Sequence, residues 1–320
     1  MNTGSPVLEI NEVGPRDGLQ IEARMVPTED KIAFIDALSD CGFARIEVTS
    51  FTSPKAIPAL ADAGAVMQGI RRRPGVIYTA LVPNIRGLER ALEAGVDEMN
   101  LVMSCSETHN RANLRMTRQQ SFDELSQVLA AAARTGAPCN VSLSTAFGCP
   151  FDGDVPAQQV LDLAARLADA GARGITLCDT TGMAYPSQVG ELCAQAAQRL
   201  PGIALTAHLH NTRGMALANA ITAWQAGITR FDAAAGGLGG CPYAPGASGN
   251  VNTEELVHMF ECMGVKTGVS LEPLFAILRG LPALVGRELP IALLRAGPRL
   301  AAHPPPEWLA QRFGAAPQAA

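Results

Sequence analysis

The stretch PAQQVLDLAARLADAGARGITLCDT, residues 156–180, contains a helix followed by a strand. Residues 156–171 place apolar side chains at helical spacing and end at Ala-Gly, which is typical of a helix closed by a glycine. Residues 174–180 form a short apolar, β-branched run, which predicts a buried strand. Alternation of such helices and strands predicts parallel strands joined by helical crossovers.

The same unit recurs along the chain. Runs that predict strands occupy residues 7–13, 45–50, 76–82, 98–103, 140–146, 174–180, 204–210 and 230–235, and helical patterns follow, for example at 28–42 and 121–136. Eight units predict an α/β fold, a (β/α)8 TIM barrel, over residues 1–267. We expect appended C-terminal helices at 268–313, as a cap or oligomer contact, and a flexible tail at 314–320. The alternative is a doubly wound open sheet, but GPRDG at 14–18 is not the glycine pattern of a Rossmann turn.

Composition limits the kinds of partner. The 320 residues are 48% hydrophobic and carry a net charge of −5, without a basic stripe, which argues against a nucleic-acid partner. No apolar run approaches the ~20 residues that span a bilayer, so we expect no membrane partner. The N-terminus lacks the features of a signal peptide. The eight cysteines include no CxxC pair and are typical of free thiols, so we expect a cytoplasmic location.

Polar side chains recur where the predicted strands end. In TIM barrels the chemistry lies at the carboxyl ends of the strands. The polar residues found there are Arg16, Asp17, Gln20, Glu47, Asn84, Ser142, Ser144, Asp179, His208 and His210. We therefore expect them to surround one site.

The sharpest local signal is His208-Leu209-His210. Residues two apart on a strand share a face, so both imidazoles can reach one ion; the alternative is a hydrogen-bonded pair in the barrel mouth. Asp17 ends the first strand and Asn250 follows the eighth, and both strands lie near the seventh when the barrel closes. We therefore predict that Asp17, His208, His210 and Asn250 hold one divalent metal. This donor set favours Mg²⁺ or Mn²⁺, with Zn²⁺ as a competitor.

Three charged residues beside this set have more than one interpretation. Arg16 is either a fixed cation that meets developing negative charge or a salt bridge to Asp17. Glu47 either holds Arg16 or is a solvated carboxylate at the end of its strand. Asp179 could orient a histidine, accept a proton, or cap the turn at residues 180–182.

The segment GGLGGCPYA at 236–244 predicts a mobile loop over the substrate. Its glycines permit positive φ and a close backbone approach, which we expect of Gly239 at the substrate. Cys241 is either a small buried filler or a proton donor and acceptor carried into the mouth.

These residues together resemble the 3-hydroxy-3-methylglutaryl-CoA lyase family. The matching segments are EVGPRDGLQ (12–20), IEVTSFTSPK (46–55), VPN (82–84), CDTTG (178–182), HLHNTRGMALAN (208–219) and GLGGCPYAPGASGN (237–250). The resemblance covers most of residues 7–270. It implies a divalent metal and an acyl-CoA substrate, and we also expect a homo-oligomer. Residue by residue it implies metal binding by Asp17, His208, His210 and Asn250, and catalytic roles for Arg16, Glu47, Asp179 and Cys241.

The fifth strand departs from the family pattern. Asn140 and Ser142 stand where members commonly carry Arg and Tyr, and Thr145 where Cys is common. The predicted substrate-binding residues are Asn140 and Ser142 together with Gln20, Asn84, Ser144 and Gly239. The predicted reaction is a retro-Claisen cleavage of 3-hydroxy-3-methylglutaryl-CoA to acetyl-CoA and acetoacetate. The alternatives are a lyase for another 3-hydroxyacyl-CoA such as citramalyl-CoA, a Claisen-type synthase, and a non-catalytic paralogue that binds acyl-CoA.

Overall fold

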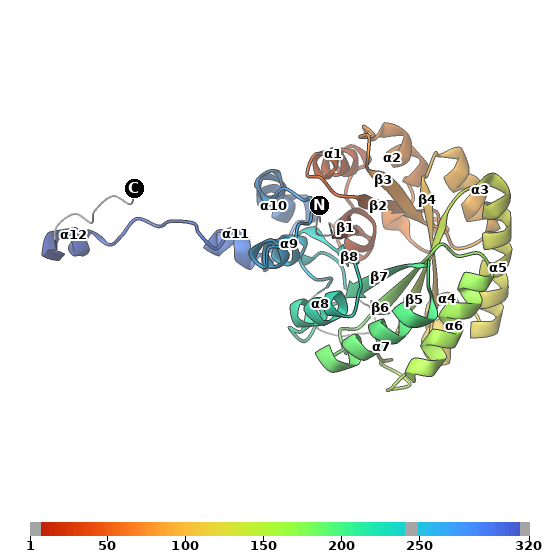
Figure 1. Ribbon diagram of the computed structural model, residues 1–320. Coiled ribbons are helices and arrows are strands. Elements are labelled where there is room, and N and C mark those ends of the chain that lie inside the picture. The colour runs from red at the N-terminus through yellow and green to blue at the C-terminus, as the bar shows by residue number, and fades with distance from the viewer. Residues whose placement is uncertain (1–7, 241–248, 314–320) are drawn as a thin grey trace, which may run out of the picture.

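Eight parallel strands close into a barrel in the order of the chain (Figure 1). The structure is a computed structural model that describes residues 8–240 and 249–313. The strands are β1 (Glu9–Glu12), β2 (Arg45–Ser50), β3 (Ile77–Leu81), β4 (Glu98–Ser104), β5 (Cys139–Ser144), β6 (Gly174–Asp179), β7 (Ala204–Leu209) and β8 (Arg230–Ala233). Because β1 pairs with both β2 and β8, no edge is left open. The predicted TIM barrel is confirmed, and the open sheet is wrong.

Helices form a ring around this barrel (Figure 1). They are α1 (Thr28–Ser39), α2 (Ala63–Gly69), α3 (Ile85–Glu93), α4 (Glu107–Leu114), α5 (Arg118–Thr135), α6 (Ala157–Asp169), α7 (Pro186–Arg199), α8 (Ala216–Gln225) and α9 (Thr253–Cys262). Helix α5 begins before the predicted residue 121 because Thr117 and Gln120 form a reciprocal capping box. In the described part of the chain, no helix is both long and apolar enough to cross a membrane.

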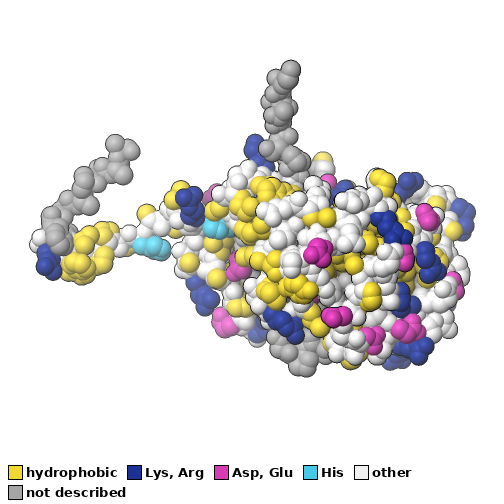
Figure 2. Space-filling model, turned by 60° about the horizontal axis from the view of Figure 1, so that its bottom comes forward, with side chains coloured by type: hydrophobic (Ala, Val, Ile, Leu, Met, Phe, Trp, Pro, Cys, Tyr) yellow, Lys and Arg dark blue, Asp and Glu magenta, His cyan; other side chains and the backbone are white. Residues whose placement is uncertain are grey.

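Three further helices follow the barrel: α10 (Leu271–Val285), α11 (Ala292–Ala296) and α12 (Glu307–Phe313). Helix α10 packs beside α1 and α9, and its Leu274, Leu278 and Leu281 belong to the same apolar core as the barrel. Figures 1 and 2 show the chain beyond α11 running away from the barrel. Helix α10 therefore shares the core of the barrel, and the domain boundary expected at residue 267 stays a prediction. The predicted tail at 314–320 lies outside the described residues.

The apolar core lies between the strands and the helices. Ile46 and Val48 on β2 and Leu177 on β6 are buried in this outer shell. Alternate residues point into the barrel, and on β2 these are Arg45 and Glu47. The inside of the barrel is therefore polar, although TIM barrels usually fill it with branched apolar side chains.

The lowest interior layer holds a row of three ion pairs. Arg45 bonds to Glu9 and approaches Glu98 to 3.4 Å, and Arg230 lies 2.8 Å from Glu9. Arg45, Glu98 and Arg230 also line a polar cavity of about 240 Å³. The charged side chains thus pair with one another at the end of the barrel opposite the carboxyl ends of the strands.

Candidate active site

A cavity of about 350 Å³ opens at the carboxyl ends of the strands. The polar residues in its wall include Arg16, Asp17, Gln20, Glu47, Asn100, His109, Ser142, Ser144, His208, His210 and Asp232. This is the end at which TIM-barrel enzymes place their chemistry. Most of the polar residues predicted from strand ends therefore do surround one space.

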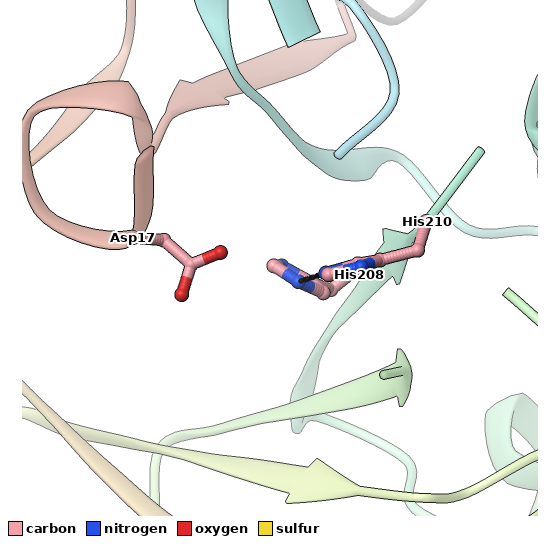
Figure 3. A group of neighbouring side chains, drawn as sticks. All are labelled: Asp17, His208 and His210. Atoms are coloured by element: carbon pink, nitrogen blue, oxygen red, sulfur yellow. Dashed lines mark hydrogen bonds between the residues drawn. The ribbon is translucent and has the colours of Figure 1, made fainter. Parts of the chain in front are cut away.

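Three of the predicted metal ligands approach one another in this mouth (Figure 3). Asp17 lies in the short helical turn η1 (Gly14–Gly18), His208 lies on β7, and His210 follows that strand. One ligand atom from each residue lies within 4.8 Å of those of the other two. The two histidine Nε2 atoms are 3.1 Å apart. In Figure 3 the carboxylate of Asp17 and both imidazoles point toward the same space.

The donor chemistry of this cluster fits a divalent cation. Burial and the charge of His208 lower the pKa of His210 to about 4, so its imidazole is neutral and has a lone pair to donate. Burial favours the neutral acid of Asp17, but Arg16, the two histidines and a bond from Asn250 hold the pKa of Asp17 below its ordinary value. These effects keep Asp17 ionised, and carboxylates and neutral imidazoles are metal ligands.

Asn250 supplies the fourth predicted ligand. Its Nδ2 donates to Asp17 Oδ2 at 2.8 Å and to the carbonyl of Leu238 at 3.0 Å. Its Oδ1 is buried, and no donor among the described residues reaches it. An amide oxygen without a partner beside a carboxylate and two imidazoles suits Mg²⁺ or Mn²⁺.

Asp232 is a site residue that the strand-end pattern does not identify. It lies on β8 in register with His208 on β7, and its Oδ2 is 3.2 Å from His208 Nδ1. Its Oδ1 accepts a 2.8 Å bond from Asn11 Nδ2. Burial alone would lower the pKa of His208, but the bond to Asp232 and the nearby carboxylates raise it. Such a carboxylate orients a ligand histidine so that its other nitrogen faces the ion. The signal in the sequence is one acid inside the strand-like run at 230–235.

Arg16 lies between two carboxylates. Its Nη1 donates to Asp17 Oδ1 at 2.6 Å, and its Nε is 3.8 Å from Glu47 Oε2. Glu47 is only 5% exposed, so the solvated alternative for this residue is wrong. Burial raises the pKa of Glu47 against the opposing effects of Arg16 and Asn100. A guanidinium fixed in this way has N–H donors to offer to a substrate oxygen in the cavity.

Asn140 and Ser142 lie at different depths in the barrel. Ser142 lines the mouth cavity, whereas Asn140 lines the polar cavity beneath it. Asn140 Nδ2 donates to Asn100 Oδ1 and to Thr176 Oγ1, each at 2.9 Å. The predicted contact between Asn140 and the substrate is therefore corrected, because its amide is used in the layer below.

Asp179 turns away from the cavity. Its neighbour Cys178 lines the cavity, and successive strand residues point to opposite faces. Asp179 Oδ1 accepts a 2.7 Å bond from the N–H of Met183, and burial raises the pKa of Asp179 to about 6. Of its three predicted roles, this contact fits the cap of the turn at residues 180–182. The geometry does not support a direct catalytic role.

Of the other residues predicted to bind substrate, some line the mouth cavity and some do not. Gln20 and Ser144 line the mouth cavity. Asn84 does not: its Oδ1 caps α3 by accepting a 2.9 Å bond from the N–H of Gly87, which corrects that prediction. Gly239 has φ +102°, and a Cβ there would lie 2.6 Å from Asn250 Nδ2, so a side chain would displace a proposed metal ligand. Cys241 lies outside the described residues.

One buried carboxylate connects the two segments that carry Asp17 and Asn250. Glu12 Oε1 accepts bonds from the N–H groups of Gly14 at 2.8 Å and Ala235 at 3.0 Å, and Oε2 accepts one from Thr253 Oγ1 at 2.7 Å. Burial raises the pKa of Glu12 to about 7. Glu12 thus ties the Arg16-Asp17 turn to both ends of the segment at 235–253.

Comparison with known proteins gives consistent matches. The family model described as HMGL-like matches residues 7–280. A hydroxymethylglutaryl-CoA lyase from Bacillus subtilis is 50% identical over 281 residues, covering 88% of this chain and 94% of the relative. An (R)-citramalyl-CoA lyase from Chloroflexus aurantiacus is 42% identical over 299 residues, covering 90% and 94%. A solved HMG-CoA lyase from Acinetobacter baumannii, in complex with coenzyme A and 3-methylmalate, has a TM-score of 0.92 and 47% identity, covering 96% of this chain and 100% of its own.

Proposed function

This chain belongs to the HMGL-like family, and from this premise we propose that it is a divalent-metal-dependent carbon–carbon lyase. The proposed reaction cleaves 3-hydroxy-3-methylglutaryl-CoA to acetyl-CoA and acetoacetate. The observation that carries the proposal is the cluster of Asp17, His208 and His210, which opens into a cavity beside Arg16. The cluster can bind the divalent metal that the reaction needs, and Arg16 can stabilise the negative charge that develops during the reaction.

Asp17, His208, His210 and Asn250 would hold the metal. When bound, a divalent cation would polarise a substrate oxygen and orient the substrate. Asp232 keeps the His208 ring in place through Nδ1, which leaves Nε2 for the ion. The chain itself therefore supplies both the ligands and the support that fixes one of them.

The bond changes of the reaction assign the role of Arg16. The 3-hydroxyl of the substrate loses its proton, C3 becomes the ketone of acetoacetate, and the C2–C3 bond breaks. The electron pair of that bond forms the enolate of acetyl-CoA, which is then protonated at C2. Arg16 stabilises the enolate oxygen with N–H donors that are already in position.

Two proton transfers remain to be assigned. The ring nitrogens of His208 would both be in use, Nδ1 by Asp232 and Nε2 by the ion, and Asp179 does not line the cavity, so neither residue is proposed as the base for the 3-hydroxyl. Cys241 is proposed as the acid that protonates C2, a role that rests on the family resemblance alone.

A second substrate has specific support. The relative from Chloroflexus aurantiacus is named for citramalyl-CoA. In this chain Ser142 also places a small side chain in the wall of the mouth cavity. We therefore propose citramalyl-CoA as the second candidate. A non-catalytic paralogue is less favoured, because all four proposed metal ligands are present.

The test is cleavage of both thioesters by the purified protein, with Mn²⁺, with Mg²⁺ and after chelation. We expect metal-dependent release of acetyl-CoA, with acetoacetate as the second product from 3-hydroxy-3-methylglutaryl-CoA. Pyruvate as the main second product, formed from citramalyl-CoA, would favour the second candidate. Failure to cleave either thioester with either metal would reject the lyase proposal.

A further inference from the structure

A chain of hydrogen bonds inside the barrel ends on Glu47. Asn100, on β4, accepts two bonds at Oδ1, from Asn140 Nδ2 and Ser142 Oγ, each 2.9 Å long. Its Nδ2 donates to Glu47 Oε1 at 2.8 Å. The carboxylate only accepts and the Asn140 amide nitrogen only donates, so a flipped Asn100 would face like against like. The network therefore fixes the Asn100 carboxamide in one orientation.

This orientation decides how Glu47 meets Arg16. Oε1 is bonded to Asn100, and the approach of Glu47 to the guanidinium is made by Oε2, which lies 3.8 Å from Arg16 Nε. The opposite charges attract across that distance, but it is too long for a hydrogen bond. Arg16 Nε accordingly has no hydrogen-bond acceptor among the described residues. Without the bond to Asn100, Glu47 would be free to form the short, two-bonded pair that carboxylates and guanidinium groups favour.

We propose that Asn100 is a positioning residue that holds Glu47 back from Arg16. Glu47 then attracts the guanidinium without occupying its donors, so that those not bonded to Asp17 stay available to a substrate oxygen. This inference rests on the proposed function, because it assumes that Arg16 acts on the enolate. Asn140 and Ser142 contribute by fixing Asn100 from the opposite side.

The test replaces Asn100 by leucine, which has a similar size and no donor. Changes to residues that orient a catalytic group commonly lower activity by ~10–100-fold. We expect a loss of that order in kcat, with KM changed by less than about threefold, because the donors act on the transition state. In a Glu47→Gln background, Asn100→Leu should cause almost no further loss, because its effect passes through Glu47.

The matched control is Thr79→Val. Thr79 lines the same lower cavity and is not part of the network that ends on Glu47, so its kcat should stay within about twofold of wild type. Crystal structures of the wild type and Asn100→Leu provide a readout that needs no turnover. They should show the closest Glu47–Arg16 contact shortening to about 2.8 Å in the variant. If the leucine variant does not fold, Asn100→Ala takes its place.

Two results would overturn the proposal. One is an unchanged position of Glu47 in the variant structure. The other is a loss from Asn100→Leu that multiplies with the loss from Glu47→Gln, since that would indicate independent effects. If the wild type cleaves neither thioester, the proposed function fails, and the crystal structures alone then decide the role of Asn100.

Discussion

Replacing Glu12 by glutamine should stabilise the protein at pH 8 and change its stability little at pH 5. Glu12 Oε1 accepts two backbone N–H bonds, and Oε2 accepts the hydroxyl of Thr253. A glutamine side chain at this position can keep the first two bonds through its oxygen. Its amide nitrogen can donate to the Thr253 hydroxyl, which accepts as well as donates. Glutamine therefore imitates the protonated carboxyl at nearly the same size.

The size of the stabilisation expected from Glu12→Gln follows from the pKa of Glu12. Burial raises the pKa of Glu12 from the ordinary value of 4.5 to about 7 in the folded state. At about 1.4 kcal/mol per unit, this shift corresponds to roughly 3 kcal/mol. The folded state binds the proton of Glu12 more tightly, so the contribution of Glu12 to the free energy of unfolding is highest below pH 4.5 and falls as the pH rises to 7. Above pH 7 the wild type bears the full penalty of a buried carboxylate, and Glu12→Gln does not.

Urea unfolding at pH 5 and pH 8 measures this difference. Trp224 packs against the core residue Phe260, with ring centroids 6.1 Å apart, so its fluorescence should report unfolding. Between these two pH values, the free energy of unfolding should fall in the wild type by about 2–3 kcal/mol more than in Glu12→Gln. The exposed Glu191 on α7 gives the control Glu191→Gln, which should follow the wild type. An equal fall in the wild type and Glu12→Gln would refute the reasoning, because the other titrating groups cancel in the comparison.

The remaining predictions concern the site itself. His208→Ala should lose bound Mn²⁺ in equilibrium dialysis, because a ligand is removed; full metal occupancy and full turnover would reject the site. Arg16→Gln should lower kcat by ~10²–10³-fold with a much smaller rise in KM, whereas a purely structural arginine would give a lower melting temperature with near-normal kcat. Ser142→Tyr should change the ratio of kcat/KM for 3-hydroxy-3-methylglutaryl-CoA and citramalyl-CoA, and an unchanged ratio would exclude Ser142 from specificity. Asn140→Arg should instead lower the melting temperature, because it disrupts the layer beneath the cavity; an unchanged melting temperature would contradict that placement.

The strand and helix patterns predict the barrel and the histidine pair, but they do not predict which face of a strand a residue occupies at its end. Asp179 and Asp232 are both acids near strand ends, and the pattern selects Asp179. In the structure Asp232 faces the barrel interior and supports His208, whereas Asp179 points away. A shift of one residue exchanges the two faces, and predicted strand boundaries are less accurate than that.

Depth along the barrel axis is the second property that the pattern does not fix. Asn140 and Ser142 share the interior face of β5, yet only Ser142 reaches the mouth cavity. Their depth depends on how the strands are staggered around the barrel, and this register is set by contacts between segments far apart in the chain. The sequence pattern therefore could not predict that Asn140 lies below the mouth cavity; the structure of the closed barrel was needed.

The polar interior also has a consequence for folding. A slip of β2 by one residue would turn Arg45 and Glu47 outward into the apolar shell and bring Ile46 and Val48 inside. Separating a buried charge from its partner typically costs ~3–5 kcal/mol, so the slipped barrel would be strongly disfavoured. If aliphatic side chains filled the barrel instead, the free-energy difference between the correct and the slipped register would be smaller. The ion pairs among Glu9, Arg45, Glu98 and Arg230 therefore favour the correct register during folding, because they form only when these strands are aligned.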